Sequence, residues 1–489
     1  MIKHSTPVEE AGQAVPGLTS AVFARQKELV KQIRLEVIQR YRPALQSGSG
    51  PIRVMARMVA EAEQRCRKAG IADQVIQAEF VNRTLGDVDL RKIVECEGEP
   101  GGMQDYRMLA DEVGIALPGE EVNGYRASGK TYLLLRHTMM EYERMLLRQH
   151  IDLRVYDMPG IGNPVLRGWL AESMQQWGIK VGEEQIFLSQ GSLNGIDRTL
   201  RGLCQYYDEQ ALTEGRAMLC PSPGFTVPEQ QARFYGYRIH HVQTMPQNHF
   251  KVTAEQVADA LEQAPDIRVI YLIITNNPTT FALTADELRA IYEVLRSYRA
   301  KGRKVLVLAD LAYIGTGRPE DDQARMAAFK AQELLPYTIF ASSFSKAFSL
   351  TGDSMGWITI GDPDLAERLR PTWASSVASQ PAEWQLRYMA YLRYFQENTW
   401  ITDKLRNFYR YRRRNFIAEL RRLHERTPLF AEIYLDDNAT IYNWSKLQPG
   451  HDAFTLFERV GLAGVPGSGF GYTDDYIRFS IGTIPVTTA

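Results

Sequence analysis

The stretch TIFASSFSK, residues 338–346, joins an apolar run to a group of hydroxyl residues that ends in a lysine. An unbroken apolar run of this length is typical of a strand buried on both faces of a parallel sheet. Further runs of this kind lie upstream and alternate with segments of helical periodicity: QIFLS (185–189), AMLC (217–220), VIYLIIT (269–275) and KVLVLAD (304–310). The alternation predicts βαβ units and an α/β fold with a mostly parallel sheet. Because such sheets bind ligands at the carboxyl ends of their strands, the residues directly after each run are the first candidates for a functional site.

The segments on either side of this core have other patterns. Apolar residues at helical spacing predict helices over 20–45, 53–69 and 131–149, and Pro164 is placed to open another. The Gly- and Glu-rich residues 91–130 predict loops or an insertion. Residues 382–425 are helical and basic, and we interpret their arginines as a solvated face. Segments 433–447 and 476–482 suggest a small α+β domain.

We therefore expect three parts. Residues 1–150 form an N-terminal helical segment and an insertion that contribute to the small domain, 151–370 form the large domain, and 371–489 form the C-terminal small domain. This division follows from the places where the strand–helix alternation begins and ends.

Composition limits the functional classes. The chain has 489 residues, 44% hydrophobic and 24% charged, with a formal net charge of −1. This charge gives no attraction for nucleic acid or an anionic membrane, and no apolar run reaches the roughly 18 residues of a membrane-spanning helix. The N-terminus lacks the pattern of a signal peptide, and the four cysteines form no CxxC pair and no metal-like cluster with the histidines. We expect a cytoplasmic protein with reduced cysteines and no metal, nucleic-acid or membrane partner.

Two ionisable residues follow apolar runs. Lys346 ends the motif SSFSK (342–346). A lysine near a buried site can lose its charge through desolvation, and a neutral amine can form a Schiff base. A surface lysine is the plain alternative. Asp310 ends the run 304–310, where a buried carboxylate needs a cationic partner such as a protonated ring nitrogen; a helix-capping role is the alternative.

Three more motifs lie at the ends of predicted strands. Asn277, in TNNPT (275–279), precedes a proline and is therefore biased to an extended or turn conformation that leaves its amide free for a ligand. Gly191 and Ser192, in SQGSL (189–193), would open a helix whose N–H groups can bind a phosphate. Phe225, in PGF (223–225), offers an aromatic face that could stack on a flat ring.

In this order, the five motifs resemble fold-type I pyridoxal 5′-phosphate (PLP) enzymes of the class I/II aminotransferase family, over about residues 156–478. The resemblance implies a PLP-binding large domain with a mostly parallel sheet, and a small α+β domain from the N- and C-terminal segments. It implies that Lys346 forms the Schiff base with the cofactor and that Asp310 pairs with the pyridine nitrogen. The further contacts that it implies are Asn277 and Tyr313 to the 3′ oxygen, Phe225 to the ring, and Gly191, Ser192 and Ser343 to the phosphate.

The resemblance extends to both ends of the matching region. Tyr156, in YDMPGIGNP (156–164), looks like the tyrosine that reaches the phosphate of the neighbouring subunit, which implies a homodimer. VPGSGFG (465–471) and YIR (476–478) look like the C-terminal signature. Its arginine, here Arg478, would bind the substrate α-carboxylate through a bidentate fork.

Two features depart from the family pattern. Eight positions after the lysine, where the family usually has a phosphate-binding arginine, the chain has Ser354. Between TLGDVD (84–89), which looks like an early family motif, and Tyr156, the chain is longer than usual. This insertion contains GYRASGKT (124–131), which fits the P-loop pattern but lacks the preceding strand that a P-loop requires. Its Arg126 and Lys130 are candidates to replace the missing phosphate cation.

The resemblance implies an aminotransferase-like enzyme that uses the Lys346 Schiff base to stabilise a carbanion at the Cα of an amino acid. The alternatives are a PLP-dependent lyase or a β/γ-replacement, cyclising or decarboxylating enzyme of specialised biosynthesis, which the two departures favour slightly. A PLP-sensing transcriptional regulator is more remote, because the N-terminal segment shows no winged-helix composition or basic patch. A catalytically inactive homologue is disfavoured because every ring-contacting residue is present. The sequence does not identify the substrate or the bond that is broken.

Overall fold

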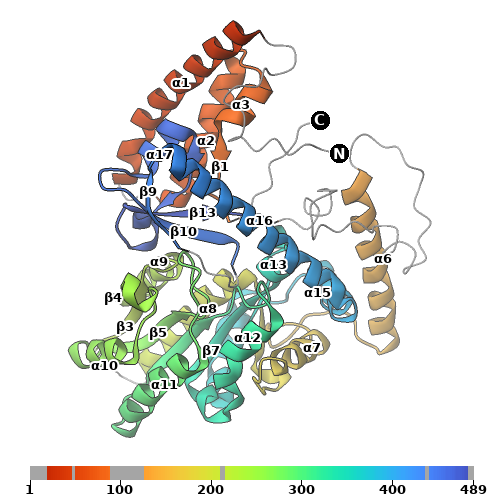
Figure 1. The fold of residues 1–489 in the computed structure, drawn as a ribbon. Coiled ribbons are helices and arrows are strands. Elements are labelled where there is room, and N and C mark those ends of the chain that lie inside the picture. Colours follow the sequence, from red (N-terminus) through yellow and green to blue (C-terminus); the bar gives the residue numbers. More distant parts are fainter. Residues whose placement is uncertain are drawn as a thin grey trace.

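The molecule is described by a computed structural model over residues 19–46, 50–86, 88, 126–209, 215–434 and 440–482, with backbone only for 46, 126–136, 400 and 404. A seven-stranded sheet, which we call the large sheet, forms the core of its lower part (Figure 1). The spatial order is β2-β8-β7-β6-β5-β3-β4. The strands are β2 (Ile186–Gln190), β3 (Ala217–Ser222), β4 (Arg238–Gln243), β5 (Ile267–Ile273), β6 (Leu306–Asp310), β7 (Thr338–Ser343) and β8 (Met355–Ile360).

The topology confirms the expected α/β fold with a mostly parallel sheet. Strand β8 is antiparallel to both of its neighbours, β2 and β7, and the other neighbouring pairs are parallel. The five predicted apolar runs coincide with β2, β3, β5, β6 and β7. The sequence did not predict β4, because RIHHVQ is polar and mostly exposed, as an edge strand can be. Strand β8, with the sequence MGWITI, is buried throughout and was not among the predicted runs.

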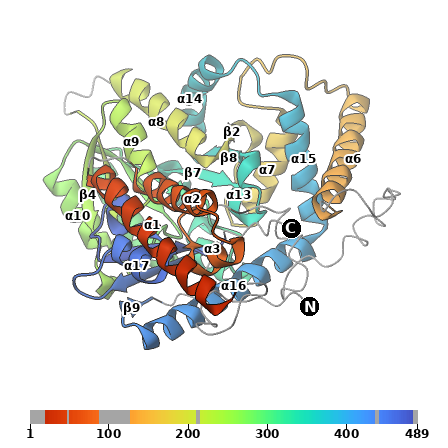
Figure 2. The same cartoon turned by 90° about the horizontal axis from the view of Figure 1, so that it is seen from above.

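Helices cover both faces of the large sheet (Figures 1 and 2). Alternate strand residues enter two cores: Phe187 belongs to the core that includes residues of α8, α9 and α14, whereas Leu188 belongs to the core that includes residues of α7, α10 and α11. The helices of this part are α6 (Arg126–Arg148), α7 (Pro164–Gln175), α8 (Gly191–Glu209), α9 (Val227–Phe234), α10 (Ala254–Gln263), α11 (Ala285–Ala300), α12 (Pro319–Met326), α13 (Phe344–Ala347), α14 (Pro363–Ser376) and α15 (Ala382–Glu397). Because both faces of the sheet are packed, the carboxyl ends of its strands are held in place, and the site residues lie there.

A smaller part is built from both ends of the chain, as expected. The small sheet has the order β12-β13-β10-β9, and β1 pairs in parallel with β11. Arg34 of α1 donates to the Phe457 carbonyl of α17 and forms an ion pair with Glu79. The elements are α1 (Ser20–Gln46), α2 (Pro51–Lys68), α3 (Asp73–Glu79), β1 (Val81–Asn82), α16 (Thr399–Arg426), β9 (Phe430–Ile433), β10 (Tyr442–Leu447), α17 (Ala453–Val460), β11 (Leu462–Ala463), β12 (Val465–Pro466) and β13 (Tyr476–Ser480). The boundaries at 150 and 370 stay a prediction.

Two expectations about helices need correction. Helix α6, which lies beside α15 in both ribbon views, begins at Arg126, so residues 126–130 are helical rather than loop (Figures 1 and 2). The preceding part of the predicted insertion lies outside the described residues. In α16, the solvated-face interpretation is wrong for Arg413, which is buried and donates to the Thr440 carbonyl. A guanidinium has several donors and can enter a domain contact when carbonyl oxygens accept from it.

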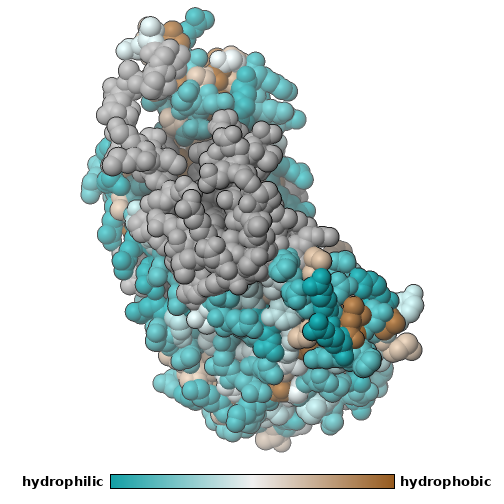
Figure 3. Space-filling model, turned by 90° about the vertical axis from the view of Figure 1, so that its right-hand side faces the viewer, coloured by the Kyte–Doolittle hydropathy of each residue, from teal (hydrophilic) through white to brown (hydrophobic). Residues whose placement is uncertain are grey.

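The coloured surface in Figure 3 is mostly hydrophilic, with hydrophobic residues in small separate groups. Among the described residues, no helix combines the length and the apolar character needed to cross a membrane. Cys66, Cys204 and Cys220 are free thiols. Cys96 lies outside the described part of the chain.

Candidate active site

Lys346 and Asp310 lie at the carboxyl ends of two adjacent parallel strands. Asp310 is the last residue of β6 and pairs in register with Ala341 of β7. Lys346 follows β7 by three positions, in the short helix α13, and is half-buried. Its Nζ donates a hydrogen bond to the carbonyl oxygen of Gly86, which belongs to the N-terminal segment after β1. The sheet therefore puts both ionisable groups at one edge, as the sequence predicted.

The Asp310 carboxylate is buried and has two neutral donors. It is 5% exposed, accepts from Tyr271 Oη at 2.8 Å and from the Ala312 N–H at 2.9 Å. Burial raises the pKa of Asp310, and the two hydrogen bonds oppose that rise. The capping alternative is realised only as the local bond to Ala312. In the described part of the chain, no cation contacts this carboxylate directly. A cationic ring nitrogen would supply such a partner, so the carboxylate fits the pyridine of PLP.

Arg478 is buried at a junction of three segments. It lies in β13, is 1% exposed, and donates from Nη1 to Asn277 Oδ1 at 3.1 Å and from Nη2 to the Thr84 carbonyl at 2.7 Å. Its guanidinium lies 4.1 Å from the ring centre of Tyr442 and 4.8 Å from that of Phe470. Burial lowers the pKa of Arg478. Within the described part, its Nε has no hydrogen-bond partner, which leaves a buried donor for a ligand.

Tyr313 joins the same network. It is buried in the turn after β6, and its Oη donates to Tyr442 Oη at 3.3 Å. Burial raises the pKa of the Tyr313 phenol, whereas the nearby Arg478 charge lowers it. Asn277, Arg478, Tyr442 and Tyr313 therefore form one continuous chain of contacts, so the structure brings together three residues that the sequence selected separately.

The proposed phosphate side lies at the opposite end of the candidate set. Gly191 has φ +76° and opens α8 directly after β2. A Cβ on Gly356 of β8 would lie 2.5 Å from the Gly191 carbonyl carbon, so glycine is needed at 356 for the two backbones to approach. Ser192 is half-buried in the first turn. Ser343 Oγ accepts from the Ser345 N–H and lies 3.0 Å from the Met355 carbonyl, so this hydroxyl is bonded within the protein.

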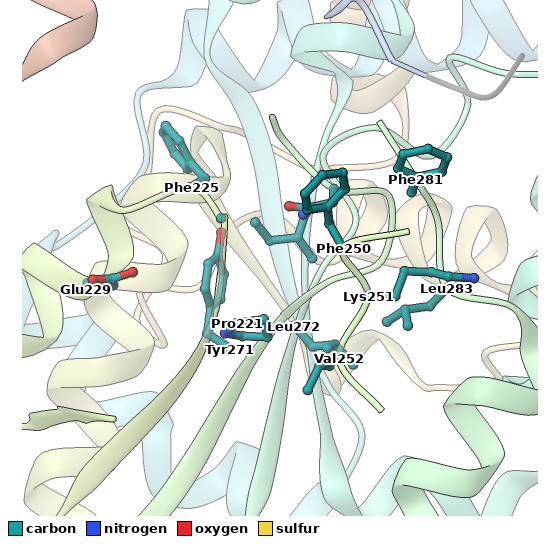
Figure 4. A pocket seen from close by; sticks show the side chains of 13 residues that line it. Pro221, Phe225, Glu229, Phe250, Lys251, Val252, Tyr271, Leu272, Phe281 and Leu283 are labelled. Carbon is teal, nitrogen blue, oxygen red and sulfur yellow. The ribbon is translucent and has the colours of Figure 1, made fainter. Parts of the chain in front are cut away.

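Phe225 follows β3 and is held by two neighbouring contacts. Gly224 N donates to the Phe470 carbonyl at 3.0 Å, and Asn276 Nδ2 donates to the Pro223 carbonyl at 3.0 Å. Phe225 is half-buried and lines a pocket of about 30 Å³ with Tyr271. In Figure 4, Phe225, Glu229 and Tyr271 lie on one side of this pocket, and Phe250, Phe281 and Leu283 lie on the other. Phe225 thus lies close to Tyr271, the partner of Asp310.

The other sequence candidates lie apart from this network. Tyr156 is 74% exposed, and within the described residues it shares no hydrogen bond with the other candidates. Ser354 is half-buried with φ +51°, directly before β8. Its neighbour Asp353 forms an ion pair with Arg387 at 3.3 Å. The side chains of Arg126 and Lys130 lie outside the described residues.

Sequence reasoning missed several residues of the site. Tyr271 lies inside a predicted strand, where a phenol among aliphatic residues was a usable signal. Thr84 and Gly86 belong to TLGDVD, which was noted without a role. Tyr442 and Phe470 carried no signal of their own, because their importance comes from contacts with Arg478 across the fold.

Known proteins are similar to this chain in sequence and fold. The chain is 29% identical over 231 residues to histidinol-phosphate aminotransferase of Halobacterium salinarum, covering 46% of this chain and 56% of that protein. It is 26% identical over 276 residues to aspartate aminotransferase of Geobacillus stearothermophilus, covering 56% of this chain and 67% of that protein. The chain thus matches little more than half the length of the first of these relatives.

Solved structures share the fold at low sequence identity. An aminotransferase from Mycobacterium tuberculosis superposes with a TM-score of 0.63 at 18% identity, over 90% of this chain and 94% of that one. The aspartate aminotransferase of Thermus thermophilus with maleate gives 0.61 at 20% identity, over 89% and 93%. The sequence profile of aminotransferase class I and II matches residues 149–487, more than half of the chain. The chain therefore belongs to the class I and II aminotransferases, a family that uses PLP.

Proposed function

We propose that this chain is a PLP-dependent, aminotransferase-like enzyme that acts on an amino acid. The observation that carries the proposal is the placement of Lys346 and Asp310 at the carboxyl ends of adjacent parallel strands. Family membership supports it. Transamination is the reaction that the similar sequences favour, since the relatives named above are aminotransferases.

The residues present fit the cofactor. Asp310 would pair with the ring nitrogen, Phe225 would cover the ring, and the 3′ oxygen would be bound by Asn277 and Tyr313. The phosphate would be bound by the N–H groups at Gly191 and Ser192 and by the Ser343 hydroxyl, which would have to turn from Met355. Bound through Lys346, the cofactor would act as an electron sink for bond breaking at the substrate α-carbon.

The chain's own groups would bind the substrate and move its proton. Among the described residues, Arg478 Nε is a buried donor without a hydrogen-bond partner, and a carboxylate could accept from it and from the adjacent Nη2 in a side-on fork. The Tyr442 and Phe470 rings on the guanidinium restrict its orientation. Lys346 Nζ would take and return a proton at the α-carbon, and the Gly86 carbonyl is an acceptor that holds this amine in place.

Two alternatives have distinct predictions. A lyase or a replacement, cyclising or decarboxylating enzyme would release a product other than a keto acid. A PLP-sensing regulator would need an N-terminal DNA-binding unit, whereas α1 packs against α17 of the C-terminal part. This packing favours a role for α1 in the small α+β part. Product analysis by mass spectrometry across the amino acids separates the catalytic outcomes.

A homodimer with Tyr156 at the interface belongs to the proposal. Val155, Tyr156 and Met158 are 63%, 74% and 85% exposed, an unusual degree of exposure for neighbouring large side chains of this kind. Such a group supports a protein contact surface here, and a twofold dimer is the commonest assembly. Tyr156 would reach the phosphate in the partner subunit. The arginine missing at Ser354 makes such extra phosphate contacts valuable.

Substitution Lys346→Ala should abolish cofactor attachment. Borohydride reduction of the wild-type protein should remove its visible absorbance and leave cofactor on the peptide that contains Lys346, and turnover of the variant should fall by roughly 10³-fold or more. Lys180 is exposed, so Lys180→Ala is the matched control. This variant should retain cofactor after borohydride reduction and should have the turnover of the wild type. Full activity in Lys346→Ala would rule out the proposed function.

Substitution Asp310→Asn should change the pH dependence of apoprotein stability. The raised pKa of Asp310 means that its ionisation disfavours the folded apoprotein as the pH rises above about 4, whereas below its ordinary pKa near 3.9 the penalty is absent. An asparagine can accept from Ala312 N–H and donate to Tyr271 Oη. Relative to wild type, the variant's melting temperature should therefore rise by a few degrees from pH 4 to pH 7.

Asp259 is exposed, so Asp259→Asn is the control. The difference in melting temperature between this variant and wild type should be the same at pH 4 and at pH 7. If the melting-temperature difference of Asp310→Asn is also the same at pH 4 and at pH 7, Asp310 is not a buried carboxylate without a charged partner.

Shared active sites predict complementation between the inactive Lys346→Ala and a Tyr156→Ala variant that should bind the cofactor phosphate less well. Mixed dimers of Lys346→Ala and Tyr156→Ala contain one site with both native residues, so mixing the unfolded chains and refolding them together should restore activity above that of either variant alone. Sedimentation of the wild type should show a dimer at micromolar concentration. A fully active monomer, or no gain on mixing when both variants sediment as dimers, would contradict the shared site.

A further inference from the structure

Tyr442 lies where three functional groups of the site meet. It is the first residue of β10 and is 3% exposed. The Arg478 guanidinium carbon lies 4.1 Å from the centre of the Tyr442 ring, and the Tyr442 hydroxyl oxygen accepts a hydrogen bond from Tyr313 Oη at 3.3 Å. The Tyr313 and Tyr442 rings meet edge to face, with centres 5.8 Å apart and planes at 68°. One side chain thus touches both the carboxylate-binding arginine and the tyrosine at the cofactor's 3′ oxygen.

Gly86 adds the link to the cofactor lysine. A Cβ at position 86 would lie 1.9 Å from Tyr442 Oη, so the Gly86 backbone directly faces the phenol oxygen. The carbonyl of the same residue accepts from Lys346 Nζ. The position of the Tyr442 hydroxyl therefore depends on the segment that anchors Lys346, and any larger residue at 86 would displace it.

The ring and the hydroxyl of Tyr442 have separable effects. A guanidinium over an aromatic face is attracted by the ring quadrupole, most strongly where water is excluded, as around the buried Arg478. A phenol has one proton to donate and can also accept. If Tyr313 donates to the cofactor oxygen, Tyr442 can donate to Tyr313, and each hydroxyl in this chain strengthens the next.

We propose that Tyr442 is a positioning residue that couples the two halves of the site: its ring orients Arg478 for the substrate carboxylate, and its hydroxyl directs the Tyr313 proton to the cofactor's 3′ oxygen. This inference rests on the proposed function. The two effects come from different atoms, so two substitutions separate them. Tyr442→Phe keeps the ring and removes the hydroxyl, and Tyr442→Leu removes both.

The test uses the holoenzyme and two binding readouts. The first is the midpoint of the pH titration of the cofactor's visible absorbance, which reports the hydrogen bond to the 3′ oxygen. The second is the Kd of propionate, an unreactive carboxylate, measured at constant ionic strength from the same absorbance. Tyr442→Phe should raise the midpoint by roughly 0.5 pH unit or more, because a weaker hydrogen bond from Tyr313 destabilises the cofactor form with the anionic 3′ oxygen. The same variant should change the propionate Kd by less than about twofold. Tyr442→Leu should also raise that Kd by about tenfold or more.

Tyr292→Phe is the matched control. It removes another buried phenol hydroxyl, which bonds Thr338 at the opposite end of β7, and should change neither readout. An unchanged midpoint in Tyr442→Phe would overturn the role of the hydroxyl, and a wild-type propionate Kd in Tyr442→Leu would overturn that of the ring. Either result would be obtained in variants whose cofactor is still attached to Lys346 by borohydride reduction. Loss of trapping in the wild type would instead overturn the proposed function.

Discussion

The burial of Arg478 is the constraint on which the site depends. A full positive charge removed from water costs several kcal/mol unless other groups replace its hydration. The structure replaces it with oxygens from two distant segments, at Thr84 and Asn277, and with the aromatic faces of Tyr442 and Phe470. Among the described residues, these direct contacts are neutral. The N-terminal segment, the large sheet and the small sheet meet at this one side chain.

Asp310 is the counterpart with the opposite sign. It is also buried, and its hydrogen bonds come from a phenol and a backbone N–H, neither of which carries a charge. A protein gains no stability from two buried charges that are paired only with neutral groups. Their retention makes sense for a ligand that brings a cationic ring nitrogen to one and an anionic carboxylate to the other. In the proposed function, the same electrostatic demand would link the binding of cofactor and substrate.

The sequence predicted the parts of the fold that depend on local pattern. The runs that became β5, β6 and β7 are continuous and apolar because both faces of each strand are covered. Asp310 is the last residue of β6, and Asn277 and Lys346 follow β5 and β7. The sequence did not predict strand β4, because an edge strand does not need an apolar run. The solvated-face interpretation fails for Arg413 because a basic sequence gives no sign of the Thr440 carbonyl, an acceptor 27 residues away in the segment before β10.

Contacts between distant segments could not be predicted from the sequence. Tyr442 is 36 residues before Arg478 (478 − 442) and 129 residues after Tyr313, and only the fold brings the three together. The proposed role of Tyr156 would require a second copy of the chain, and the fold of one chain does not supply it. The positions of Asp310, Lys346 and Arg478 do not depend on the substitution at Ser354.

The central claim is that the buried charges of Arg478 and Asp310 face one ligand space. A crystal structure of the holoenzyme with a bound, unreactive amino acid analogue tests it most directly. The account predicts the analogue's carboxylate on the Arg478 guanidinium and the cofactor's ring nitrogen within hydrogen-bond distance of Asp310. A carboxylate bound elsewhere with Arg478 still on Asn277 and Thr84, or a ring nitrogen that points away from Asp310, would contradict it.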